Sequence, residues 1–62
     1  MTCLMIDIGS TELSYKDEER LQNKLVGGVI LFSRNYKNKK QIKALTASIR
    51  KIKKNILIAV DH

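Results

Sequence analysis

Three runs divide the chain, each of them apolar except for Asp7 in the first. They cover residues 3–8 (CLMIDI), 29–32 (VILF) and 56–60 (ILIAV). Short continuous apolar runs rich in β-branched residues are typical of strands buried on both faces of a parallel sheet. We therefore predict strands over residues 3–8, 28–33 and 56–60.

The first intervening segment carries a helix-start signal. Ser14 stands three residues before Asp17, which resembles a capping box, and Glu18 and Glu19 add negative charge where a helix dipole favours it. This pattern predicts a short helix over residues 15–23.

The second intervening segment predicts a longer helix over residues 39–53. Asn38 is a suitable N-cap, and Asn55 is placed to end the helix in a left-handed conformation. Apolar residues recur at helical spacing along one stripe of this segment. The stripe consists of Ile42, Leu45, Ile49 and Ile52.

The order strand, helix, strand, helix, strand predicts an α/β fold. Right-handed crossovers make the three strands parallel neighbours and put both helices on one side of the sheet. The other sheet face is also apolar, and nothing in the sequence is left to cover it. We therefore expect residues 1–62 to form a single incomplete segment of a larger domain, with poor solubility on its own.

Composition narrows the functional classes. The single cysteine, Cys3, cannot form an internal disulfide, and we expect it to be a buried thiol. No apolar run approaches the roughly 18–20 residues of a membrane span. The first residues also lack the basic segment of a signal peptide. These features favour a cytoplasmic protein without a membrane segment.

Charge is distributed unevenly along the chain. The net charge is +6. Residues 1–31 contain three Lys/Arg and five Asp/Glu, whereas residues 32–62 contain nine Lys/Arg and only one acid, Asp61. A small module that binds RNA or another polyanion is one interpretation of this basic half. The other is a solvated, lysine-rich helix face, and the aromatic residues do not alternate with the basic ones as in a base-stacking surface.

Candidate chemistry gathers after the predicted strands. Asp7, Arg34 and Asp61 each fall at the carboxyl end of one, where parallel α/β folds meet ligands. Two carboxylates across a cleft are also the catalytic pair of many glycosidases, although the sequence leaves the distance between Asp7 and Asp61 open. The sequence contains no metal-ligand spacing, no Ser/His/Asp set and no glycine-rich phosphate loop.

Three segments together resemble a known family. They are residues 5–8 (MIDI), residues 25–36 (LVGGVILFSRNY) and residues 58–62 (IAVDH). In this order and spacing they resemble the N-terminus of bacterial family 3 glycoside hydrolases, in particular the β-N-acetylglucosaminidases (β-hexosaminidases) of peptidoglycan recycling. The resemblance spans essentially all 62 residues.

The resemblance implies a (β/α)8 barrel of the TIM type. This chain would be the first βαβαβ portion of that barrel, so the barrel is incomplete in it. It implies hydrolysis of terminal N-acetylglucosamine from cell-wall muropeptides in the cytoplasm, without cofactor or metal. Asp61 matches an aspartate that binds sugar hydroxyls. Asp7, Arg34 and Asn35 match positions that support the barrel mouth, and His62 matches the residue before a Glu-Gly-Gly-Arg continuation.

The resemblance also implies that the catalytic groups lie elsewhere. The nucleophilic aspartate and the acid/base histidine of the family come much later in the chain, so no residue here is expected to be catalytic. We therefore expect a truncated β-N-acetylhexosaminidase that is inactive by itself. One alternative is the module that binds RNA or another polyanion, and the other is a fragment that complements a separately encoded remainder of the barrel. Of these ligands, we do not expect nucleic acid.

Overall fold

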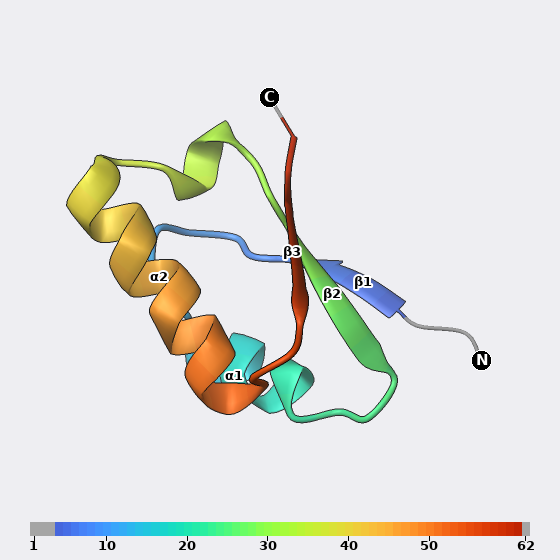
Figure 1. The fold of residues 1–62 in the computed structure, drawn as a ribbon. Helices are drawn as coiled ribbons and strands as arrows, with labels where there is room; N and C mark the ends of the chain where they lie inside the picture. Colours follow the sequence, from blue (N-terminus) through green and yellow to red (C-terminus); the bar gives the residue numbers. More distant parts are fainter. Residues whose placement is uncertain (1–3, 62) are drawn as a thin grey trace.

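The computed structural model describes residues 4–61, which form a parallel sheet with helices on one side (Figure 1). Cys3, which we expected to be a buried thiol, and His62, which matches a family position, lie outside the described residues. The elements follow the predicted alternation of strands and helices, with one short 3-10 helix, η1, added after the second strand. In order they are β1 (Leu4–Asp7), α1 (Tyr15–Leu21), β2 (Val26–Leu31), η1 (Ser33–Asn35), α2 (Lys39–Ile52) and β3 (Leu57–Val60).

The sheet has the order β1-β2-β3, and both pairings are parallel. Ile6, Val29 and Ile58 stand side by side across the three strands. Val29 is fully buried, and the other two pack against the core, so this row faces the helices. The described residues thus form the α/β arrangement that the sequence predicted.

The opposite face of the sheet is open. Successive side chains of a strand point to opposite faces, so the neighbouring row of Met5, Gly28 and Leu57 points away from the helices. Met5 is 42% and Leu57 is 61% exposed. The uncovered apolar face that the sequence predicted is therefore present in the structure.

Both helices begin where the capping residues predicted. The Ser14 hydroxyl accepts from the Asp17 backbone N–H at 3.1 Å, and the Asp17 carboxylate accepts from the Ser14 N–H at 3.0 Å. Asn38 accepts from the Gln41 N–H at 2.8 Å at the start of α2. The stripe of α2 enters the core through Leu45 and Ile49.

The helices end earlier than predicted. The structure ends α1 at Leu21 instead of residue 23, and α2 at Ile52 instead of residue 53. The prediction of a left-handed Asn55 is wrong, because no non-glycine residue described has a positive φ. Arg50 instead donates to the Ile56 carbonyl beyond the helix at 3.0 Å. The Lys53 ammonium donates to the carbonyls of Asn23 and Val26, at the start of β2.

The glycine pair lies within β2 and not in a turn before it. Gly28 is buried, and a Cβ added there would clash with the Met5 sulfur. A side chain at position 28 would therefore collide with Met5, so this strand position requires glycine. The side chain of Met5 occupies the space over this glycine. β2 begins and ends two residues earlier than the predicted strand over residues 28–33.

Candidate functional site

The polar residues predicted from the sequence gather at one edge of the sheet, at the carboxyl ends of the parallel strands. Asp7 ends β1, η1 follows β2, and Asp61 follows β3. Asp7 is in register with Ile30 and Ala59, so its side chain falls on the open face. Asp61 comes two residues after Ala59 and falls on the same face by alternation.

Arg34 joins η1 to the end of β1. Its Nη2 donates to the Asp7 carboxylate at 2.6 Å, and its Nε donates to the Ile8 carbonyl at 3.3 Å. The guanidinium also lies over the Phe32 ring, 4.8 Å from the centroid. Both partners of the ion pair are about half exposed, so water screens their attraction. The pair orients Arg34 more than it stabilises the fold.

Asn35 is fully buried and uses its whole side-chain amide. Its Oδ1 accepts from the Phe32 backbone N–H at 2.7 Å, and its Nδ2 donates to the carbonyls of Ile8 and Ser10, both at 2.7 Å. A buried polar group is stable only when its hydrogen bonds are satisfied. Asn35 therefore ties the segment after β1 to the turn after β2.

Asp61 is exposed at this edge. Its backbone N–H donates to the Leu31 carbonyl at 2.8 Å, which continues the parallel pairing one residue past β3. Its carboxylate forms no ion pair with any residue in the described range 4–61. Of the two carboxylates on the open face, Asp7 is thus neutralised by Arg34, whereas Asp61 is available to accept hydrogen bonds from a ligand.

Asp7 and Asp61 are not brought together as a catalytic pair. They belong to strands separated by β2 and are offset along the sheet, which puts their backbones about 12 Å apart by standard strand spacings. The paired carboxylates of a retaining glycosidase are about 5 Å apart. Because Asp7 is also held by Arg34, the two carboxylates are not arranged to act as a pair.

Sequence reasoning missed a second arginine at the same edge. Arg20 Nη2 donates to the Asp7 carbonyl at 3.0 Å and to the Asp17 carboxylate at 2.7 Å. Burial would raise the pKa of Asp17, but the hydrogen bonds from Ser14 and Arg20 outweigh it and hold that pKa below its ordinary value. The available signal was the spacing Asp17-x-x-Arg20, which puts both side chains on one helix face.

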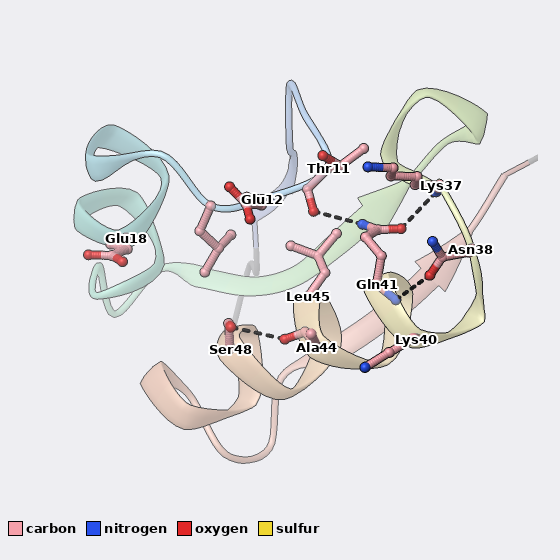
Figure 2. Close-up of a pocket in the computed structure, with 11 residues that line it drawn as sticks. Thr11, Glu12, Glu18, Lys37, Asn38, Lys40, Gln41, Ala44, Leu45 and Ser48 are labelled. Atoms are coloured by element: carbon pink, nitrogen blue, oxygen red, sulfur yellow. Dashed lines mark hydrogen bonds between the residues drawn. The ribbon is translucent and has the colours of Figure 1, made fainter.

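A groove of about 550 Å³ is lined by residues of α1, α2 and the segments that precede these helices (Figure 2). Acidic Glu12 and Glu18 line it together with basic Lys37 and Lys40. Within residues 4–61, no three His, Cys, Asp or Glu side chains gather as a metal site would require. None of the described helices is long and apolar enough to cross a membrane.

Comparison with known proteins identifies relatives of this chain. No family model matches the chain. The β-hexosaminidase of Bordetella pertussis is 50% identical over 60 residues, which are 95% of this chain and 17% of that protein. The β-hexosaminidase of Hydrogenovibrio crunogenus is 51% identical over 61 residues, which are 97% of this chain and 17% of that protein.

A solved structure agrees with these relatives. NagZ from Neisseria gonorrhoeae, in complex with N-trifluoroacetyl-D-glucosamine, superposes with a TM-score of 0.91 at 40% identity. The match covers 98% of this chain and 18% of that one. The chain belongs to the β-hexosaminidases, a class of glycosidase. Within that class, it corresponds to the N-terminal region of the NagZ-type enzymes of glycoside hydrolase family 3. The comparisons do not support the RNA-binding or complementation alternatives.

Proposed function

We propose that this chain is the first βαβαβ portion of a (β/α)8 barrel that hydrolyses terminal N-acetylglucosamine from cell-wall muropeptides. The observation that carries the proposal is the 50% sequence identity to the B. pertussis β-hexosaminidase over 95% of this chain. The TM-score of 0.91 to a sugar-bound NagZ supports it. The chain spans only 17% of the B. pertussis relative, which supports the proposal that residues 1–62 are one incomplete segment of that domain. The cytoplasm is the proposed compartment, as the family resemblance implies.

The open sheet face supports the barrel. In a closed barrel, one face of each strand packs inside and the other faces the surrounding helices. Met5, Ile30 and Leu57 form an apolar surface on the side without helices. The remaining five strands and six helices of the barrel would bury this surface and pair the free edges of β1 and β3.

Asp61 is the proposed sugar ligand. A carboxylate that accepts hydrogen bonds from hydroxyl groups forms stronger bonds than a neutral acceptor does. Asp61 lies at the carboxyl edge, where barrel enzymes bind substrates, and no other described residue forms an ion pair with it. Asp7, Arg34 and Asn35 are proposed to support the mouth, since each of them binds a partner within the protein.

The segment alone is proposed to be inactive. Retaining hydrolysis requires a nucleophile and an acid/base group, and the family resemblance assigns both to later parts of the barrel. The two carboxylates on the open face do not replace them, because Asp7 is paired with Arg34. No metal or cofactor is proposed for the reaction.

A chimera tests the proposal directly. Residues 2–61 would replace the matching segment of the B. pertussis β-hexosaminidase, and hydrolysis of a chromogenic N-acetyl-β-glucosaminide would be measured. We expect activity within about tenfold of the parent enzyme, since the two segments are 50% identical. A folded chimera without activity would contradict the proposed function. Turnover by the isolated 62-residue chain would contradict the proposal that the segment is inactive alone.

A further inference from the structure

The loop that leaves β1 is held by side chains from three other elements. Within residues 7–11, four backbone carbonyls each accept a hydrogen bond from a distant side chain. They are the carbonyls of Asp7, Ile8, Ser10 and Thr11. The donors are Arg20 in α1, Arg34 and Asn35 in η1, and Gln41 in α2. Because loop carbonyls otherwise bind water, this arrangement fixes the path of residues 8–11.

Gln41 makes the longest of these connections in sequence (Figure 2). Its Nε2 donates to the Thr11 carbonyl at 2.7 Å and to the Asn35 carbonyl at 2.9 Å. Its Oε1 accepts from the Lys37 backbone N–H at 2.7 Å. The half-buried amide thus joins the β1–α1 loop, the end of η1 and the start of α2.

Gln41 and Asn35 act in series. Gln41 holds the backbone of Asn35, and the Asn35 side chain holds the carbonyls of Ile8 and Ser10. Only an amide fits the position of Gln41, because it must donate two hydrogen bonds and accept one. A glutamate there keeps the acceptor and loses both donors.

We propose that Gln41 is a positioning residue for the sugar site. It fixes the β1–α1 loop, which leaves the same sheet edge as Asp61 and forms one wall of the barrel mouth. Gln41 itself lies in the helix layer and does not touch the substrate. The inference rests on the proposed function, because the wall matters only if this edge binds the sugar.

The test uses the full-length chimera with Gln41→Met, which keeps the volume of the side chain, and Gln41→Glu, which keeps only the acceptor. Ser48→Ala is the matched control, since Ser48 lines the same groove and its hydroxyl bonds only to the Ala44 carbonyl of its own helix. Steady-state kinetics would be combined with hydrogen exchange of residues 8–12. We expect KM to rise about tenfold in both Gln41 variants, with kcat within about twofold and faster exchange in the loop.

The outcomes separate the two claims. Faster loop exchange with an unchanged KM would overturn the inference, because the loop would then lie outside the sugar site. Unchanged exchange would also overturn it, because the hydrogen bonds of Gln41 would then not hold the loop. An inactive but folded unsubstituted chimera would contradict the proposed function, and with it any site for Gln41 to position.

Discussion

The buried amide of Asn35 offers a sharp test of how the carboxyl edge is held together. Asn35→Ala removes three hydrogen bonds, each worth about 1 kcal/mol net. It also leaves the Phe32 N–H without its partner, whereas the Ile8 carbonyl keeps the bond from Arg34. We expect the free energy of unfolding to fall by about 2–4 kcal/mol.

The measurement is urea unfolding of the chimera, followed by circular dichroism. Asn35→Asp serves as a second variant, because it keeps the volume and the acceptor but turns a carboxylate towards two carbonyl oxygens. It should destabilise at neutral pH at least as much as the alanine variant does. Asn55→Ala is the control, since Asn55 is exposed, and its effect should stay within about 0.5 kcal/mol. If Asn35→Ala matched that control, the reasoning about the buried amide would be refuted.

Three further predictions concern the charged residues of the edge. Asp61→Asn should lower kcat/KM of the chimera about 10- to 100-fold, because a hydrogen bond to a charged acceptor contributes about that factor to binding. The unfolding midpoint should stay unchanged, and a large loss of stability would indicate a structural role instead. A double-mutant cycle of Asp7→Asn and Arg34→Met should give a coupling energy below about 1 kcal/mol, because both side chains are half exposed; a value of several kcal/mol would show a buried pair. Because the pKa of Asp17 is lowered in the folded state, its stabilisation should be complete above the ordinary aspartate pKa of the unfolded chain and should be lost as the pH falls through the lower folded value. Asp17→Asn should weaken this acid dependence, and an unchanged acid-unfolding profile would contradict the assignment.

Local patterns in the sequence were sufficient to predict the order and type of the main elements. The capping residues Ser14 and Asn38 act within three positions of themselves, so sequence spacing alone reveals them. The apolar stripe of α2 is equally local. The start of β2 was predicted two residues too late because the apolar run begins only after the glycine pair, whereas the strand begins at Val26 and includes both glycines.

The side-chain contacts of the carboxyl edge could not be predicted in the same way. The bonds of Arg20 to Asp7 and of Gln41 to Thr11 join residues 13 and 30 positions apart, and they exist only once the helices dock on the sheet. Sequence patterns indicated Asp7, Arg34 and Asp61 as strand-end residues. They did not show that Arg34 binds Asp7 and that no described residue pairs with Asp61.

The central claim is that the carboxyl edge of this sheet is part of a sugar site, with Asp61 as a ligand. A crystal structure of the chimera with N-trifluoroacetyl-D-glucosamine, the compound bound in the N. gonorrhoeae structure, tests it most directly. The account predicts that the Asp61 carboxylate accepts hydrogen bonds from sugar hydroxyls, while Asp7 remains paired with Arg34. A bound sugar that makes no contact with Asp61 would contradict the claim.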